Sequence, residues 1–472
     1  MAKYDVIIVG AGLAGLSTGA ILAKAGKKVL ILEKSKDIGG FARTYRPFPG
    51  YYIDQGMHGF HLSSESATAE VYQRVGKSLP EFPAVPPSVS PVSIVDVSET
   101  YHDGQWKRMA DMIDPDEMAK IFDLITRLSD EELEELEDVS LKDYITPLTQ
   151  DPGILHLLQI FGAVLCSIKR WEDASAGEVL NSIKASLERF PGQIFNAPPV
   201  LGGYENLLPP LVEAVEENSG EIRTNTMVSE IIVEDGKAKG VEIEKGFRTE
   251  KGYISWGVER IESPIVVCTI PLWDLFKAVR EDVFPSWYVA WVKRICENLN
   301  QCWTVYAGLK EPLWEPPMVV KLMPNMPRTK STHGGCVGAH WNVIDPSAAP
   351  EGEYLFLWLC HSNSLDFPYL LEPEKAENRR RIIDVFERVE ADLIELFPKF
   401  KDALWVIRHT QNMYIAKQPG YVGKHIPDVQ PPGVEGLYLA GDKIRARGAG
   451  VGGNLATITA MKCADIILGS GQ

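Results

Sequence analysis

Residues 4–33 read YDVIIVGAGLAGLSTGAILAKAGKKVLILE, and this stretch decides the fold. An apolar run (Val6–Val9) leads into a glycine turn from Gly10 to Gly15. An Ala/Leu-rich segment follows, and a second apolar run (Val29–Leu32) ends at Glu33. This order predicts a strand, a turn, a helix, a second strand and an acid, which is typical of a dinucleotide-binding βαβ unit.

Each glycine of that unit, and the acid at its end, has a physical role. Gly10 allows the tight turn, Gly12 lets the backbone approach a pyrophosphate, and Gly15 lets the helix pack close to the strand. The free N–H groups at the start of the helix would face the phosphates. Glu33 would accept hydrogen bonds from ribose hydroxyls.

Composition places the chain among ordinary globular proteins and excludes several classes of partner. The 472 residues are 45% hydrophobic and carry a net charge of −16, which argues against a nucleic-acid partner and against strong electrostatic docking on anionic membranes. The seven cysteines form no Cys-x-x-Cys pair, so we expect reduced thiols and no metal site. Without a signal peptide or an apolar run of about 18 residues, we expect a cytoplasmic protein, with peripheral membrane contact and oligomeric state left open.

Periodicity predicts the remaining elements. The pattern is largely helical over 66–188, with a proline-rich interruption around 80–91. Strands are expected at 226–233, 240–243, 265–269, 354–360 and 436–442, and helices at 379–396 and 454–468. The last strand ends on an acid and is followed by glycines and a helix, so the two ends of the chain read as parts of one domain.

Three segments carry a resemblance to a known superfamily. The opening βαβ unit, the Gly39-Gly40 loop and the closing Ala440-Gly441-Asp442 segment resemble the FAD-dependent group of flavin amine oxidases, phytoene desaturases and carotenoid isomerases and saturases. The resemblance implies an α/β fold, with a Rossmann-like FAD-binding domain built from residues 1–66, 200–270 and 425–472. An α+β substrate domain, residues 67–199 and 271–424, would be inserted within it.

The resemblance also implies a set of cofactor contacts. Glu33 would hold the adenosine ribose, Asp442 would bind the ribityl or phosphate region, and the helix starting near Gly453 would direct its N–H groups at the flavin's pyrimidine end. The family usually has Arg after the glycine pair, whereas this chain has Phe41 and carries Arg43 two residues later. The implied FAD-binding residues are Gly10, Gly12, Gly15, Glu33, Gly40, Arg43, Gly56, Met57, His58, Val228, Gly441, Asp442, Gly452, Gly453 and Asn454.

The predicted function is that of an FAD-dependent oxidoreductase acting on an apolar small molecule. The stretch 418–421 has no cysteine for a covalent flavin, and no second nucleotide-binding fingerprint occurs, so we expect non-covalent FAD and electron exchange with oxygen, a quinone or a diffusible carrier. Hydride would pass between flavin N5 and a carbon centre in a desaturation, saturation or isomerisation of an isoprenoid, steroid-like or alicyclic compound. The alternatives are a flavin amine oxidase and a non-catalytic flavin-binding protein.

Catalytic residues are less legible than the cofactor site. His58 has a side chain suited to proton transfer and lies near the predicted flavin. Tyr414, Lys417 and Tyr421 precede the final flavin strand, where residues of amine oxidases wall the substrate cavity. We expect the aromatic cluster at 287–291 to pack in the hydrophobic core; the alternative is an apolar substrate channel or a membrane-facing patch.

Overall fold

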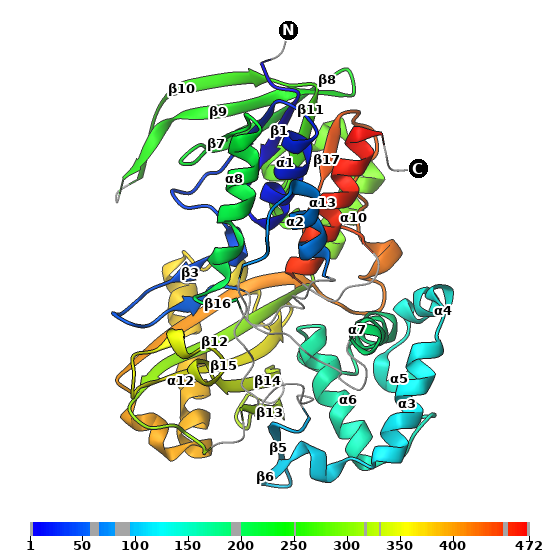
Figure 1. The fold of residues 1–472 in the computed structure, drawn as a ribbon, viewed down its shortest axis with the longest axis vertical. Coiled ribbons are helices and arrows are strands. Elements are labelled where there is room, and N and C mark those ends of the chain that lie inside the picture. The colour runs from blue at the N-terminus through cyan, green and yellow to red at the C-terminus, as the bar shows by residue number, and fades with distance from the viewer. Residues whose placement is uncertain are drawn as a thin grey trace.

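The computed structural model describes residues 3–56, 66–80, 95–189, 200–249, 252–315, 319–329, 332–446 and 452–469. The chain folds into two parts that lie one above the other in Figure 1. The upper part contains both ends of the chain, coloured blue and red, and the lower part is built mainly from the middle of the chain. The elements at the two ends therefore share one part of the fold.

A parallel five-stranded sheet forms the centre of the upper part. Its strands lie in the order β17 (Leu437–Leu439), β11 (Ile265–Cys268), β1 (Val6–Val9), β2 (Val29–Leu32) and β7 (Glu221–Arg223). β1 and β2 are buried along their whole length, which explains why both read as unbroken apolar runs. Since parallel strands end at the same edge, the residues that follow β1, β2, β11 and β17 meet there.

Four helices pack into the same core. They are α1 (Leu13–Lys24), α2 (Ala67–Val75), α8 (Pro209–Glu217) and α13 (Gly453–Leu468), and α1 packs against the other three. The helix α1 approaches the end of β1 so closely that a Cβ on Gly15 would lie 2.0 Å from the carbonyl oxygen of Gly10. Only glycine fits at this position, as the sequence predicts.

A small antiparallel sheet lies over the upper part. It contains β8 (Val228–Glu234), β9 (Lys237–Thr249) and β10 (Gly252–Glu262), and the last two strands form a hairpin that extends away from the parallel sheet (Figure 1). Asp235 and Gly236, both with positive φ, form the turn between β8 and β9. The strands expected at 226–233 and 240–243 are confirmed, and the second is longer than predicted.

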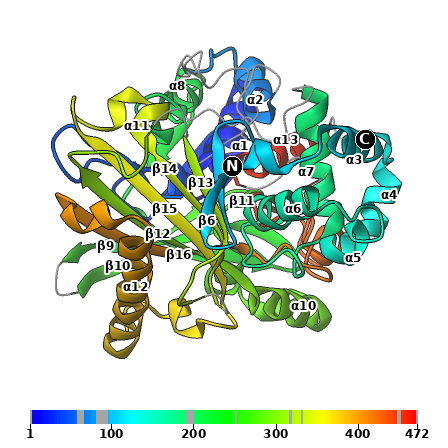
Figure 2. The same ribbon diagram turned by 90° about the horizontal axis from the view of Figure 1, so that it is seen from below.

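A seven-stranded sheet forms the centre of the lower part. Its strands lie in the order β16 (Trp405–Ile415), β12 (Leu299–Leu309), β15 (Tyr354–Asn363), β14 (Gly334–His340), β13 (Val320–Asn325), β5 (Ser98–His102) and β6 (Gln105–Arg108). Figure 2 shows α12 (Ala376–Leu396) and α6 (Pro152–Leu165) on its two sides. The helix α12 packs on Trp303 and Trp358, and α6 packs on β13 and β14.

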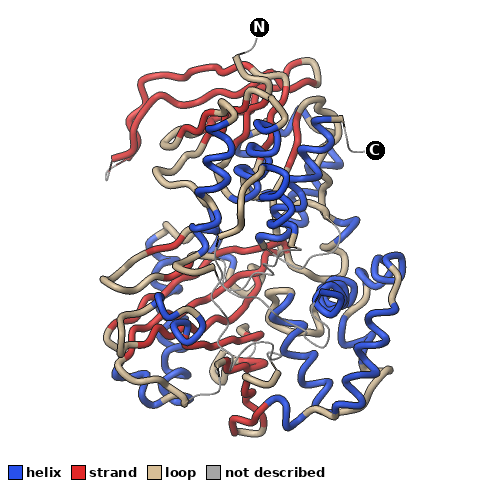
Figure 3. The backbone as a smooth tube through the Cα atoms, in the orientation of Figure 1, coloured by secondary structure: helices blue, strands red, loops and turns tan. Residues whose placement is uncertain are grey.

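The other helices of the lower part gather beside α6, as the blue segments of Figure 3 show. They are α3 (Pro115–Arg127), α4 (Asp130–Glu135), α5 (Leu141–Ile145) and α7 (Ala176–Arg189). Within the described ranges, none of the chain's helices is both long and apolar enough to span a lipid bilayer.

The prediction of a largely helical region over 66–188 is wrong at β5 and β6. These strands form a hairpin whose turn residues, Asp103 and Gly104, have φ values of 52° and 79°. An Asp-Gly pair adopts such positive φ values readily, so the turn selects a hairpin where the flanking residues carry little periodicity of their own.

The packing also shifts two predicted domain boundaries. The helix α2, placed in the substrate domain from the sequence, packs with α1 and α13 in the core of the parallel sheet. The segment after residue 270 does the same through α9 (Leu275–Ala278) and α10 (Ser286–Cys296). Tyr288 on α10 is buried in that core, whereas the neighbouring Trp287 is 60% exposed, so the aromatic cluster is mainly a packing element.

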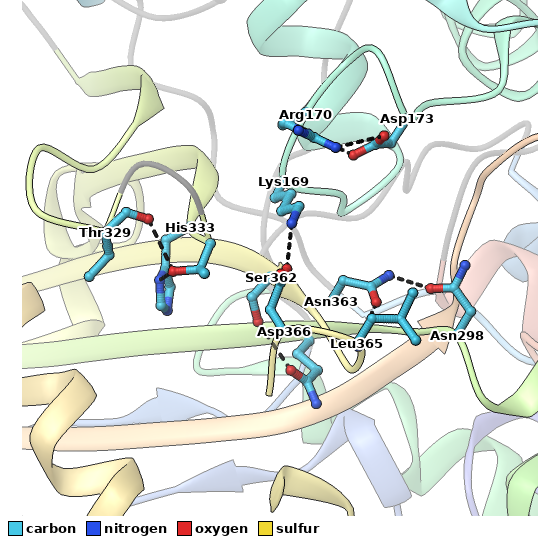
Figure 4. A network of polar contacts seen from close by, with 12 residues as sticks. Lys169, Arg170, Asp173, Asn298, Thr329, His333, Ser362, Asn363, Leu365 and Asp366 are labelled. Atoms are coloured by element: carbon cyan, nitrogen blue, oxygen red, sulfur yellow. Dashed lines mark hydrogen bonds and ion pairs between the residues drawn. The ribbon is translucent and has the colours of Figure 1, made fainter. Parts of the chain in front are cut away.

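A polar cluster joins the helices of the lower part to its sheet (Figure 4). Lys169, which follows α6, forms a largely buried ion pair with Asp366, which follows β15. Nearby, the buried Asn363 donates a hydrogen bond from Nδ2 to Oδ1 of Asn298. Breaking a buried pair leaves an unpaired polar group, so the Lys169–Asp366 pair holds the helices against the sheet, and the Asn363–Asn298 bond joins β15 to the start of β12.

Because Gly15 contacts Gly10 so closely, alanine should destabilise the protein at position 15 but not at position 12 of the same turn. Gly15→Ala should lower the free energy of unfolding by about 2 kcal/mol or more, because its Cβ meets backbone that cannot move aside. A Cβ on Gly12 would lie 3.9 Å from the nearest atom, so Gly12→Ala is the matched control and should unfold close to the wild type. Urea unfolding followed by circular dichroism compares the two, and equal stability of the two variants would contradict this account.

The buried carboxyl group of Asp54 should make the stability of the folded protein depend on pH. This buried carboxylate accepts hydrogen bonds through Oδ1 from Thr44 Oγ1 at 2.6 Å and from the backbone N–H of Tyr204 at 3.0 Å. Burial raises the pKa of Asp54 from its usual value of 3.8 to about 7. The folded state therefore holds the proton more tightly than the unfolded chain, and ionisation of Asp54 costs stability as the pH rises from about 4 to about 7.

Asp54→Asn should accordingly be more stable than the wild type at pH 8, by roughly 1–3 kcal/mol, and the difference should shrink toward pH 4. Thermal unfolding at several pH values measures this, with the exposed Glu374→Gln as a control that should show no such trend. A constant difference between wild type and Asp54→Asn across the range would mean that Asp54 ionises normally.

Candidate functional site

A cavity of about 480 Å³ opens at the carboxyl ends of the parallel strands. Its wall is formed by the residues that follow β1, β2, β11 and β17, by the 39–43 loop and by the start of α13. The predicted cofactor-binding residues that line it are Gly10, Gly12, Glu33, Gly40, Arg43, Gly56, Val228, Gly441, Asp442, Gly452 and Gly453. Segments separated by hundreds of residues thus form one site.

Glycine backbone forms the floor of the cavity. The backbones of Gly12 and Gly39 lie side by side, with the N–H of Gly39 donating to the carbonyl of Ala11 at 2.8 Å. Gly39 and Gly40 have φ values of 116° and 56°, which non-glycine residues rarely adopt. A ligand can therefore approach the main chain here without meeting a side chain.

Glu33 stabilises the glycine turn from the second strand. Its Oε2 accepts a hydrogen bond from the N–H of Ala11 at 3.0 Å, and its Oε1 accepts one from the N–H of Ser35 at 2.8 Å. A carboxylate has more acceptor sites than these two bonds use, so Glu33 retains capacity for a hydroxyl group in the cavity.

The start of α13 lies at the same cavity. Gly452 and Gly453 line the cavity, and no side chain caps the helix. Asn454, also expected to bind the cofactor, is not among the lining residues. Its side chain is buried, and neither its Nδ2 nor its Oδ1 has a hydrogen-bond partner within the described part of the chain. Such orphaned groups cost free energy unless a ligand or water meets them. With the glycine floor and the free helix terminus, they fit a bound dinucleotide.

Two predicted contacts have other partners in the structure. Arg43 lines the cavity and forms an ion pair with Asp37 at 2.8 Å. Gly15 does not line the cavity and acts through its contact with Gly10. The predicted residues Met57 and His58 lie outside the described residues.

Of the other catalytic candidates, the structure brings only Tyr414 to the cavity. Lys417 is buried elsewhere, in an ion pair with Glu178 of α7 at 3.0 Å, and Tyr421 packs under the guanidinium of Arg294. Neither residue is among those that line the cavity, where Tyr421 was expected as a wall residue and Lys417 as a catalytic candidate. The reason is that β16 ends at Ile415, and the chain then turns toward the helices of the lower part.

Tyr414 belongs to a small apolar cluster beside the cavity. It packs with Cys302, Leu359 and Met413, which come from three neighbouring strands, and Met413 also lines the cavity. Burial raises the pKa of the Tyr414 hydroxyl above its usual value, so the side chain stays neutral. The cavity therefore has an apolar wall at this end.

Lys443 is a site residue that the sequence reasoning missed. Its Nζ donates to Oδ1 of Asp442 at 2.5 Å and lies over the rings of Phe41, Trp273 and Tyr414 at 4.7, 5.3 and 5.3 Å. Burial lowers the pKa of Lys443, and the charge of Asp442 opposes this effect. Its place after the acid at the tip of β17 was the available signal, but its aromatic neighbours are distant in sequence.

The four acidic residues that line the cavity all have partners. Glu33 accepts backbone hydrogen bonds, Asp37 pairs with Arg43, Asp274 pairs with Lys277, and Asp442 pairs with Lys443. Within the described lining, Glu33 is thus the carboxylate without a cationic partner, and it lies at the glycine turn. None of the seven cysteines, which are all described, lines the cavity.

Comparison with known proteins agrees with this geometry. A prolycopene isomerase of Daucus carota is 23% identical over 501 aligned positions, covering 93% of this chain and 76% of that protein. Cyclohexylamine oxidase from Brevibacterium oxydans shares the fold with a TM-score of 0.64 at 16% identity, over 98% of both chains. A CLA-producing fatty acid isomerase from P. acnes shares it with a TM-score of 0.61 at 17% identity, over 99% and 98% of the two chains.

These similarities confirm the predicted superfamily and the Rossmann-like α/β fold class. The sequence model of flavin containing amine oxidoreductases matches residues 13–468, which is nearly the whole chain. The chain therefore belongs to the flavin containing amine oxidoreductase family.

Proposed function

We propose that the protein is an FAD-dependent oxidoreductase that moves hydride between flavin N5 and a carbon centre of an apolar small molecule. The observation that carries this proposal is the apolar wall of Met413 and Tyr414, in a cavity where three of the four described lining acids pair with cations and the fourth, Glu33, holds the glycine turn. The similarity to a prolycopene isomerase over 93% of the chain supports a desaturase, saturase or isomerase of CH–CH groups.

The residues of the chain would bind the cofactor and organise the site around it. The N–H groups at Gly12 and at the start of α13 would face the negative charge of the cofactor. Glu33 would accept hydrogen bonds from the ribose hydroxyls, and Asp442 would bind the ribityl or phosphate region. When bound, the flavin would supply two-electron transfer at N5. Met413 and Tyr414 would exclude water and orient an apolar substrate through packing, with no charged group required.

An amine oxidase is the second candidate, and the family and the shared fold of cyclohexylamine oxidase favour it. An amine substrate would need a carboxylate or an open set of aromatic faces. The aromatic faces of Phe41, Trp273 and Tyr414 are already occupied by the ammonium of Lys443. This arrangement supports an apolar substrate over a cationic one. A third possibility, a flavin-binding protein without catalysis, is separated from both by the substrate test below.

The proposal extends to partners and location. We propose a cytoplasmic enzyme, with contact to a membrane surface left open, that exchanges electrons with oxygen, a quinone or a diffusible carrier. FAD would be held without a covalent bond, since no cysteine lines the cavity.

The purified protein is expected to bind FAD reversibly. Its visible spectrum should show bands near about 370 and 450 nm, as oxidised flavins do. Acid precipitation should then release all of the FAD into the supernatant. Absence of the bands after incubation with FAD would contradict cofactor binding, and flavin retained in the pellet would contradict the non-covalent attachment.

Anaerobic mixing should distinguish the candidate substrates. If the enzyme is a desaturase, partly saturated polyenes should bleach the band near about 450 nm. Primary amines should leave it unchanged, because Asp37, Asp274 and Asp442 already pair with cations and Glu33 lies at the glycine turn. Met413→Lys should slow the bleaching about tenfold or more by placing a charge in the apolar wall, while Met413→Leu should retain it. Bleaching by amines alone would establish the amine oxidase. If neither class bleaches the flavin, the polyenes are mixed with the chemically reduced enzyme and the products are separated by chromatography: a saturated or isomerised product would support the saturase or isomerase, and no product would favour the non-catalytic protein.

A further inference from the structure

Four cationic side chains line the cavity, and they differ greatly in exposure. Lys34 is exposed, the side chain of Lys277 is 80% exposed, and that of Arg43 is 25% exposed. The side chain of Lys443 is only 5% exposed. Among the described lining residues, Lys443 is thus the most deeply buried cation.

Burying an ammonium group is costly, and the neighbours of Lys443 offset that cost. Removal from water costs several kcal/mol in typical proteins. Asp442 supplies an opposite charge at 2.5 Å, and the faces of Phe41, Trp273 and Tyr414 supply cation–π attraction. The chain therefore buries the amino group of Lys443 at a position where an apolar side chain would avoid the free-energy cost of desolvation. This points to a role for the charge itself.

The position of Lys443 suggests what that charge faces. Tyr414 connects Lys443 to the start of α13, because its hydroxyl lies 3.1 Å from where a Cβ on Gly452 would be. Phe41, under the ammonium at 4.7 Å, follows the Gly39-Gly40 floor. Lys443 thus lies between the glycine floor and the helix terminus, the two regions that fit an anionic dinucleotide.

Burial also makes this charge more effective than the others. Coulomb interactions are several times stronger in a protein interior than at a surface exposed to water. Lys34 and Lys277 are screened by solvent. Arg43 and Lys443 each pair with an acid, Asp37 and Asp442, but the Arg43 side chain is 25% exposed and that of Lys443 only 5%. A charge change at position 443 should therefore affect an anionic ligand more than a change at the exposed positions.

We propose that Lys443 is the buried counter-charge of the bound FAD, replacing the arginine that the resembling superfamily usually carries at the position of Phe41. This inference rests on the proposed binding of FAD. Lys443 acts as a positioning residue: it orients the Asp442 carboxylate and stabilises negative charge on the cofactor. Reduction adds negative charge to the flavin, so Lys443 favours the reduced form more than the oxidised form.

The test measures FAD affinity and the midpoint potential of the bound flavin in matched variants. Lys443→Met should weaken FAD binding by roughly tenfold to a hundredfold, the usual effect of losing a hydrogen bond or contact to a charged group. It should also make the midpoint potential more negative. Lys443→Arg keeps the charge and should stay near the wild type. Lys401→Met, at an exposed lysine that does not line the cavity, is the control and should change neither quantity.

A rescue variant tests the replacement directly. Phe41→Arg in the Lys443→Met background puts a cation back from the other side of the contact and should recover most of the lost affinity. Circular dichroism of the apoproteins checks folding, and Lys443→Gln takes the place of Lys443→Met if the latter does not fold.

The outcomes separate this inference from the proposed function. If the wild type binds FAD and Lys443→Met has the same FAD affinity and midpoint potential, only the role of Lys443 is overturned. A loss of FAD affinity in Lys401→Met equal to that in Lys443→Met would also overturn it, because it would indicate a general effect of net charge. Wild type that binds no FAD would overturn the proposed function itself.

Discussion

The close contact between α1 and the glycine turn is the constraint on which the rest of the structure depends. A Cβ on Gly15 would lie 2.0 Å from the carbonyl oxygen of Gly10, so the helix can begin directly over the end of β1 only with glycine there. This contact fixes the path of the turn and leaves the backbone at Gly12 open to the cavity. It also sets the direction in which the free N–H groups of α1 point.

The other walls of the cavity are positioned relative to this turn. Glu33 comes from the neighbouring strand and holds the turn through the N–H of Ala11, while the backbone of Gly39 pairs beside Gly12. The end of β17 brings Asp442 and Lys443 to the same edge, because all strands of the sheet are parallel. The lower part then contributes Met413 and Tyr414 at the end of β16. Polar groups thus gather where a dinucleotide fits, and apolar groups gather where a substrate would meet it.

Features that depend on local spacing could be predicted from the residues alone. The unbroken apolar runs, the glycines at 10, 12 and 15 and the acid at 33 all lie within residues 4–33, and their order along the chain indicates the role of each. Features that depend on long-range packing could not. Lys417 lies three residues after Tyr414 but pairs with Glu178 far from the cavity, and no local pattern distinguishes the two.

The same limit explains why Lys443 escaped notice. Its aromatic neighbours at positions 41, 273 and 414 are distant in the sequence and meet only in the folded chain. The misplaced boundary at α2 has a related cause. The sequence of an amphipathic helix shows which of its faces is buried, but it does not show which other elements pack against that face. In this fold the cover is provided by α1 and α13.

Hydrogen exchange with and without FAD tests the central claim most directly, namely that distant segments form one cofactor site. Binding should slow amide exchange together at the start of α1, at residues 39–43, at 440–444 and at the start of α13. The helix α12, which packs on the far sheet, should not change. Protection confined to the start of α1, or spread equally over α12, would contradict the account.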